Sequence, residues 1–386
     1  MKRLIGFAAA AALFGASAAS AEPVKIGMIT TLSGPGGGLG TEVRDGFQLA
    51  IAEEDGKLGG VPVELTVEDD GLKPDRGKAI ADRMVARDRV DIMTGIIFSN
   101  VAMAVVPKVV RDEVFYLSPN AGPSQLAGPG CHRNYFNVAW QNDNLHEAAG
   151  KYVTDQGYKN VYILAPNYPA GKDALTGFKR FYTGPLAGEV YTKVGQTDYA
   201  AEIAALRAAE PDAVFFFLPG GMGIAFLKQY AQAGLSDEIP LFGPAFSFDQ
   251  TILGAVGDAA LGVINTSQWN KDLDNPANAA FVQNFTETYG RLPSLYASQG
   301  YDTARLIASA LRAVNGDIAK ADAFRAALEK ADFASVRGKF RFGPNHHPIQ
   351  DIYVREVVRE GDVLTNRIVG KAFTDHADAY AAECKM

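Results

Sequence analysis

Segments with the pattern of strands alternate with segments that have the pattern of helices through most of this 386-residue chain. Residues 24–29 form an apolar run, and Val43, Phe47 and Ala50 follow at the spacing of one helix face. Residues 61–67 then alternate between apolar and polar side chains, which is typical of a half-buried strand. Because repeated strand–helix–strand units build parallel sheets covered by helices, this order predicts an α/β fold.

The alternating pattern starts a second time at about residue 144 and ends with a predicted hairpin whose turn is Glu360-Gly361-Asp362. The roughly 365 residues after the first 21 are too many for one compact core and are enough for two domains. No low-complexity linker separates the two series. We therefore expect two doubly wound parallel-sheet lobes, joined by chain crossings that form a stiff hinge.

The first 21 residues have the pattern of a secretory signal peptide. Met1-Lys2-Arg3 is a short basic region, residues 4–18 are apolar, and Ala19-Ser20-Ala21 fits the rule for cleavage sites. Cleavage after Ala21 would release the mature protein into the periplasm, because no cysteine follows the site to carry a lipid. A membrane anchor is the alternative interpretation.

The chain has two cysteines, Cys131 and Cys384. In an oxidising compartment such as the periplasm, an even number of cysteines indicates a disulfide rather than a catalytic thiol. We predict that these two residues form a disulfide that ties the C-terminal tail to the body of the protein.

A glycine-rich loop, TTLSGPGGGLG, follows the first predicted strand at residues 30–40. Its spacing does not fit a dinucleotide-binding motif, because a G-x-G-x-x-G that starts at Gly34 would need glycine where Leu39 stands. The loop also lacks the G-K-[ST] of a P-loop. Open α/β sheets nevertheless bind ligands at the carboxyl ends of their strands. We expect this loop to contact a ligand other than a nucleotide; a turn without a ligand is the alternative.

The sequence lacks the patterns of catalytic and metal sites. His346-His347 has no cysteine or carboxylate at the spacing of metal ligands, so we expect a solvated turn there. His132 and His146 stand alone and are expected to be structural or surface residues. There is no G-x-S-x-G motif and no block of Lys or Arg, and the net charge is −7. We expect no enzymatic activity, no metal, no cofactor and no nucleic-acid partner.

Two segments, IFSNVAM at 97–103 and SPNAGPSQL at 118–126, lie between predicted strands and the turns or helices that follow them. Backbone N–H groups at the start of a helix carry partial positive charge and suit a carboxylate. Helix capping alone would explain either segment. Because both segments follow adjacent strands and offer the same chemistry, together they favour an anion-binding site. The candidate contacts are Ser99, Asn100, Asn120, Ala121 and Gly122.

The order and spacing of several short motifs resemble a known family. The motifs are SGPGG at 33, GFQLAI at 46, EDDGLKPDRG at 68, NYPAGKD at 167 and GYDTARL at 300. Together they are similar to the periplasmic solute-binding proteins of ABC importers of the branched-chain amino acid (Leu/Ile/Val-binding) type, which include an aromatic-acid-binding subgroup. The resemblance covers nearly the whole mature chain.

The resemblance implies the type I periplasmic-binding fold, in which two lobes close on a small ligand and an inner-membrane permease reads the closed form. Three chain crossings near Asn142, Asn270 and Asn345 would form the hinge. The first lobe would then hold residues 22–142 and 271–345, and the second lobe residues 143–270 and 346–386. The protein is expected to be a monomer.

The resemblance also assigns a set of ligand contacts, in which Tyr168 comes from a second-lobe loop and Leu39 from the glycine-rich loop. The full set is Leu39, Ser99, Asn100, Asn120, Ala121, Gly122, Tyr168, Pro219, Gly220, Ala245, Phe246, Tyr296 and Gln299.

One departure from the family pattern concerns the ligand's amino group. Amino-acid binders of this type usually have an acidic residue after the Gly-Pro of a late turn, and here that residue is Ala245. Burying an ammonium without a carboxylate partner costs several kcal/mol. Asp249 lies nearby in the sequence, but we expect it to cap the helix that starts there.

We therefore expect a small organic acid that has a carboxylate, no ammonium and an aromatic body, similar to benzoate or cinnamate. Phe246, Phe248, Tyr168, Tyr296 and Trp140 could provide ring surfaces, although each could instead be a core residue. The second candidate ligand is a branched-chain or related amino acid, with Asp249 as the ammonium partner. A ligand-loaded sensor that docks on a membrane receptor would also fit these features, whereas a secreted enzyme would need a nucleophile–base pair.

Overall fold

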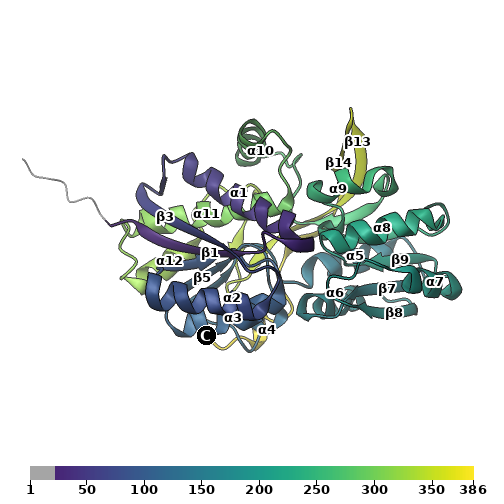
Figure 1. Cartoon of the computed structure of the whole chain (residues 1–386), viewed down its shortest axis with the longest axis horizontal. Helices are drawn as coiled ribbons and strands as arrows, with labels where there is room; N and C mark the ends of the chain where they lie inside the picture. The colour runs from purple at the N-terminus through teal and green to yellow at the C-terminus, as the bar shows by residue number, and fades with distance from the viewer. Residues whose placement is uncertain (1–21) are drawn as a thin grey trace, which may run out of the picture.

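The computed structural model describes residues 22–386, and the predicted signal peptide lies outside these residues. The described chain forms two lobes that lie side by side along the long axis of the molecule (Figure 1). Each lobe is built around its own β-sheet. No helix among the described residues combines the length and the apolar character needed to cross a membrane.

The first lobe contains a six-stranded sheet. In spatial order the strands are β2 (Lys57–Leu58), β3 (Val61–Asp69), β1 (Val24–Thr30), β4 (Ile92–Thr94), β5 (Phe115–Ser118) and β6 (Tyr135–Asn137). All neighbours pair in parallel except β2 and β3. The central strands are buried except at Lys25, as expected for a parallel sheet that is covered on both faces.

Helices from two parts of the chain cover this sheet. They are α1 (Gly37–Ala52), α2 (Pro74–Arg83), α3 (Ser99–Arg111), α4 (Ser124–Ala127), α10 (Pro276–Tyr289), α11 (Leu295–Ala313) and α12 (Ala321–Lys330). Two glycines allow α1 and α11 to pack closely. A Cβ on Gly46 would lie 2.0 Å from the Ala297 oxygen, and one on Gly300 would lie 2.0 Å from the Val43 oxygen.

The second lobe contains an eight-stranded sheet. Its strands are β12 (Arg341–Phe342), β13 (Pro348–Glu360), β11 (Ile264–Ser267), β10 (Leu241–Pro244), β9 (Ala213–Phe216), β7 (Val161–Pro166) and β8 (Leu186–Thr192), with β14 (Val363–His376) paired to β13. Its helices are α5 (Asn144–Asp155), α6 (Pro169–Phe181), α7 (Ala200–Ala209), α8 (Gly221–Gln232) and α9 (Gln250–Val256). Strands β7 to β11 are parallel, and β13 joins them antiparallel. The hairpin predicted around Glu360-Gly361-Asp362 is confirmed and is longer than its apolar pattern indicated.

The chain crosses between the lobes three times, because β1 to β6 belong to one sheet, β7 to β11 to the other, and β13 returns to the second after helices that cover the first. The type I fold with two doubly wound lobes is therefore present. The boundaries at 142, 270 and 345 stay predictions.

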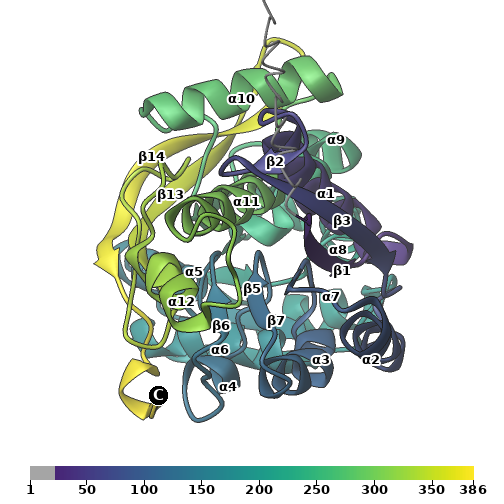
Figure 2. The same ribbon diagram turned by 90° about the vertical axis from the view of Figure 1, so that its left-hand side faces the viewer.

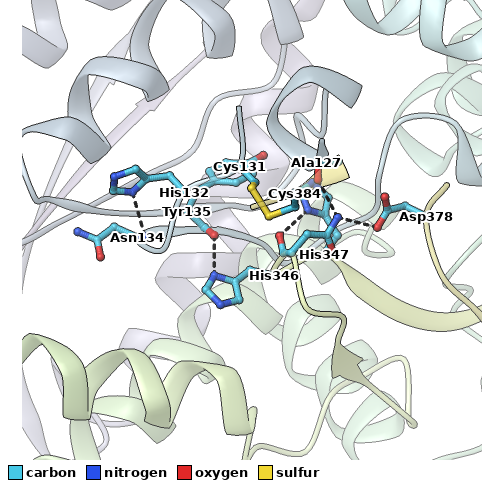
Figure 3. Close-up of a disulfide and its surroundings, with 10 residues drawn as sticks. Ala127, Cys131, His132, Asn134, Tyr135, His346, His347, Asp378 and Cys384 are labelled. Carbon is cyan, nitrogen blue, oxygen red and sulfur yellow. Dashed lines mark hydrogen bonds between the residues drawn. A yellow bond between two sulfur atoms is a disulfide. The ribbon is translucent and has the colours of Figure 1, made fainter. Parts of the chain in front are cut away.

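The disulfide between Cys131 and Cys384 is confirmed, with an S–S distance of 2.06 Å (Figure 3). It anchors the tail after β14 to the segment that follows α4 in the first lobe. Figure 2 shows the C-terminus at the opposite end of the molecule from α10. The predicted boundaries place the whole of 346–386 in the second lobe, but the disulfide holds the last residues of the tail against the first.

The expected solvated turn at His346-His347 is wrong, because both side chains are buried. The His346 ring stacks on Phe136 with the ring centres 4.0 Å apart, and its Nδ1 lies 3.1 Å from the Tyr135 oxygen (Figure 3). His347 Nδ1 lies 3.0 Å from the Asn345 oxygen. The two contacts of His346 join β6 to the residues just before β13, about 210 positions away in the sequence.

Candidate functional site

A small cavity lies between the two lobes. Side chains from both lobes and from the crossing at 138–143 form its walls. The lining residues are Leu39, Ile97, Phe98, Ser99, Asn120, Ala121, Trp140, Asn142, His146, Tyr168, Ala170, Phe217, Pro219, Phe246 and Tyr296. None of these residues, all within the described part of the chain, is Asp, Glu, Lys or Arg.

The structure brings eight of the thirteen sequence-predicted contacts together around this cavity. They are Leu39, Ser99, Asn120, Ala121, Tyr168, Pro219, Phe246 and Tyr296. The other five do not line it, although each lies close in sequence to a residue that does. They are Asn100, Gly122, Gly220, Ala245 and Gln299.

Sequence reasoning missed several lining residues. They are Ile97, Phe98, Asn142, His146, Ala170 and Phe217. Phe217 directly follows the carboxyl end of β9, so the rule that ligands bind at strand ends could have found it. His146 stands near the start of α5, directly after a crossing between the lobes, and no local pattern distinguishes it from a core residue.

The N-terminus of α3 provides the most polar part of the wall. Ser99 is the first residue of this helix, and the first N–H groups of a helix have no partner within it. Ser99 Oγ accepts a hydrogen bond from Asn142 Nδ2 at 3.2 Å, which leaves the hydroxyl proton free to donate. Together with the partial positive charge of the helix end, this arrangement suits an anionic oxygen.

Two other expected donors are already used. The Ala121 N–H donates to the Ile96 oxygen at 3.3 Å, and the Gly122 N–H donates to Asn142 Oδ1 at 3.1 Å. In this conformation these two N–H groups already have acceptors within the protein. The donors that remain at the wall include Ser99 and the start of α3.

Asp249 does not contribute to the cavity wall. Its side chain is buried and accepts hydrogen bonds from the Leu295 N–H at the start of α11, at 3.2 and 3.1 Å from its two oxygens. Asp249 stands at the N-cap position of α9, as expected, but its side chain makes no cap hydrogen bond there and accepts from the start of α11 instead. Burial is the main reason that the pKa of Asp249 is raised to about 7.

Aromatic rings form much of the remaining wall. The Phe246 ring lies 4.6 Å from Trp140, 5.4 Å from Phe217 and 6.4 Å from Tyr296, centre to centre. Tyr168 stacks on Phe217 with an angle of 16° between the ring planes. Such an arrangement provides flat apolar surfaces that can pack against a ring. Phe248, also a candidate ring surface, instead packs against Phe216 away from the cavity.

The two lobes touch at the rim of the cavity. Ser124, the first residue of α4, donates from its hydroxyl and its N–H to Asp173 of α6, at 2.7 and 3.0 Å. Gly220, at the start of α8, lies against Pro35 in the short helix Gly34–Gly36 of the other lobe. These contacts bring the two lobes together in this structure.

Within residues 22–386, no group of three or more His, Cys, Asp or Glu side chains is placed to hold a metal ion. The cavity walls offer hydrogen-bond donors and rings, so the arrangement can bind an uncharged or anionic small molecule.

Comparisons with known proteins agree with this geometry. A family model described as "Periplasmic binding protein" matches residues 23–362. The Leu/Ile/Val-binding protein homolog 6 of Brucella melitensis is 31% identical over 94% of each chain. The solved structure of an ABC transporter solute-binding protein from R. palustris in complex with benzoate is 31% identical, with a TM-score of 0.89, and the match covers 94% of this chain and all of that one.

A second solved structure is the solute-binding protein of an ABC transporter from Rhodopseudomonas palustris BisB5, in complex with 3,4-dihydroxybenzoic acid. It is 27% identical with a TM-score of 0.85, over 92% of this chain and 99% of that one. The family and the fold are those of transporter solute-binding proteins, which bind small ligands and work with a membrane permease. This chain belongs to the periplasmic binding protein family and is an ABC transporter substrate-binding protein of the type I fold.

Proposed function

We propose that this protein captures an aromatic carboxylate that lacks an ammonium group and delivers it to an inner-membrane ABC permease. One observation carries the proposal: the cavity joins the N-terminus of α3 to a set of rings, and its described lining residues include no acidic side chain. The cavity therefore offers partners for the carboxylate and the ring of a ligand. It has no acidic side chain that could pair with a ligand's ammonium group.

The carboxylate end of the ligand would lie at Ser99 and the start of α3, and its ring would lie among Trp140, Tyr168 and Phe246. An ammonium buried in the same cavity would have no carboxylate partner, because Asp249 is occupied by the Leu295 N–H. That loss of solvation costs several kcal/mol, or at least about 100-fold in affinity.

Ligand binding would favour the closed form, because the ligand touches both lobes only when they are together. The rim contacts between Ser124 and Asp173 would add to the stability of that form. The permease can then distinguish the closed, loaded protein from the open one.

Relatives support two ligand classes. Solved relatives contain benzoate and 3,4-dihydroxybenzoic acid, whereas curated relatives are named for leucine, isoleucine and valine. The names favour a branched-chain amino acid as the second candidate. The position of Asp249, which faces Leu295 and not the cavity, favours the aromatic acid.

Isothermal titration calorimetry of the mature protein, residues 22–386, tests the proposal with benzoate, cinnamate and leucine. We expect at least one aromatic acid to bind and leucine not to bind, and we expect Ser99→Ala to weaken the aromatic acid about 10-fold through loss of a charge-assisted hydrogen bond. Tight leucine binding without any binding of aromatic acids would overturn it.

We also propose that the protein acts as a monomer in the periplasm after cleavage at Ala21. The intact mass of protein purified from the periplasm would identify the new N-terminus, and light scattering would give the oligomeric state. A mass that includes residues 1–21 would contradict the cleavage.

A further inference from the structure

One side chain on the cavity wall is polar, buried and without a partner. His146 is 1% exposed and lines the cavity near the start of α5. Its Nδ1 is buried and has no hydrogen-bond partner among the described residues. Burial lowers the pKa of the His146 imidazole to about 3, so the imidazole is neutral at pH 7. A neutral imidazole has one N–H donor and one acceptor nitrogen.

The surroundings of His146 are aromatic. The centres of the Phe217, Phe215 and Phe246 rings lie 4.9, 5.8 and 5.9 Å from the imidazole. A phenylalanine or leucine would pack among these rings without leaving a polar atom unpaired, so packing alone does not account for a histidine here. Buried polar groups in native proteins are normally satisfied, and an exception at the wall of a ligand cavity indicates that the ligand supplies the partner.

The ligand's carboxylate is not the best partner for this imidazole. The start of α3 and Ser99, in the first lobe, already provide donors and partial positive charge for it. His146 belongs to the second lobe, among the rings that would surround the ligand's aromatic body. A phenolic hydroxyl both donates and accepts a hydrogen bond, so it can pair with either nitrogen of a neutral imidazole.

We propose that His146 recognises a phenolic hydroxyl on the ligand's ring, which makes hydroxylated aromatic acids the preferred cargo. This inference rests on the proposed function, since it requires an aromatic acid in the cavity. It makes His146 a specificity-determining residue: it selects among aromatic acids and is not needed to bind the unsubstituted one.

Titration calorimetry with benzoate, 3-hydroxybenzoate and 4-hydroxybenzoate tests the inference on the wild type, His146→Phe and His146→Gln. We expect the wild type to bind one of the hydroxylated acids at least 10-fold more tightly than benzoate. His146→Phe should reduce that preference, taken as the ratio of the two dissociation constants in the same variant, to less than 2-fold. His146→Gln, which keeps a donor and an acceptor, should retain part of the preference.

The inference fails if the wild type does not prefer either hydroxylated acid, or if the preference survives in His146→Phe. In the second case Asn120 is the group to examine, because its Oδ1 also lacks a partner among the described residues at the cavity wall. If a variant does not fold, which melting without ligand would reveal, the wild-type comparison can still refute the inference. Absence of binding to all three acids would refute the proposed function itself, whereas benzoate binding without a preference would refute the role of His146 alone.

Discussion

Gly220 marks a point where the two lobes come close together, and replacing it with alanine tests whether closure is coupled to binding. A Cβ at this position would lie 2.7 Å from the Pro35 oxygen of the other lobe. Real Cβ atoms do not approach an oxygen so closely, so Pro35 or the start of α8 would have to move. In an open form the lobes are apart, and the added methyl group would meet nothing there.

The size of the effect follows from the cost of overpacking. Extra methyl or methylene groups in a well-packed region cost about 1–3 kcal/mol, which corresponds to about 5- to 150-fold in an equilibrium constant. If that cost falls on the closed form alone, the dissociation constant for the ligand should rise by the same factor. Alanine at the φ of +63° and ψ of −135° of Gly220 also carries a backbone cost of about 1–3 kcal/mol, but this cost applies to both forms and lowers only the free energy of unfolding.

Gly257 provides a matched control in the same lobe. Its φ of +70° and ψ of −150° are close to the +63° and −135° of Gly220, and nothing lies within 4 Å of the position of its Cβ. Both alanine variants should therefore lose similar amounts of stability in denaturant titrations without ligand. Calorimetry with a bound aromatic acid should then show weaker binding by Gly220→Ala only. If the two variants bind with equal affinity, the contact with Pro35 does not contribute to closure and the reasoning is wrong.

Two further predictions concern Asp249 and the disulfide. Asp249→Asn keeps an acceptor for the Leu295 N–H, so affinity for an aromatic acid should stay within about 2-fold. Because the folded-state pKa of Asp249 is raised to about 7, its contribution makes the wild-type free energy of unfolding fall as pH rises from about 4 to 7. In denaturant titrations, the free energy of unfolding of Asp249→Asn should fall less over this pH range than that of the wild type. The same pH dependence in both proteins would contradict the prediction. Replacing Cys131 and Cys384 with serine should cost about 2–5 kcal/mol of stability and leave affinity unchanged, because neither residue lines the cavity. An unchanged denaturation midpoint would show that the disulfide does not stabilise the fold.

The sequence predicted most of the architecture because the signals for it are local. The periodicity of apolar residues predicted the central strands and most helices. The glycines in GFQLAI and GYDTARL form the close contact between α1 and α11. Short strands such as β6 (Tyr135–Asn137) and β11 (Ile264–Ser267) were missed, because three or four residues with polar members carry no clear period.

The candidate site was predicted less completely, because its details depend on contacts between distant residues. Strand ends and the family resemblance indicated Ser99 and Tyr168, and both line the same cavity. The hydrogen bond from the Gly122 N–H to Asn142 joins residues 20 positions apart, and no spacing in the sequence predicts it. The surroundings of His146 could not be predicted either, because its three neighbouring rings come from other parts of the chain.

The most direct measurement compares the affinities of 3-phenylpropanoate and phenylalanine, two acids that differ only by the α-amino group. A cavity without an acidic wall should bind 3-phenylpropanoate at least about 100-fold more tightly, because the ammonium of phenylalanine would be buried without a partner. Phenylalanine that binds as tightly as 3-phenylpropanoate, or more tightly, would contradict this chemistry of the cavity.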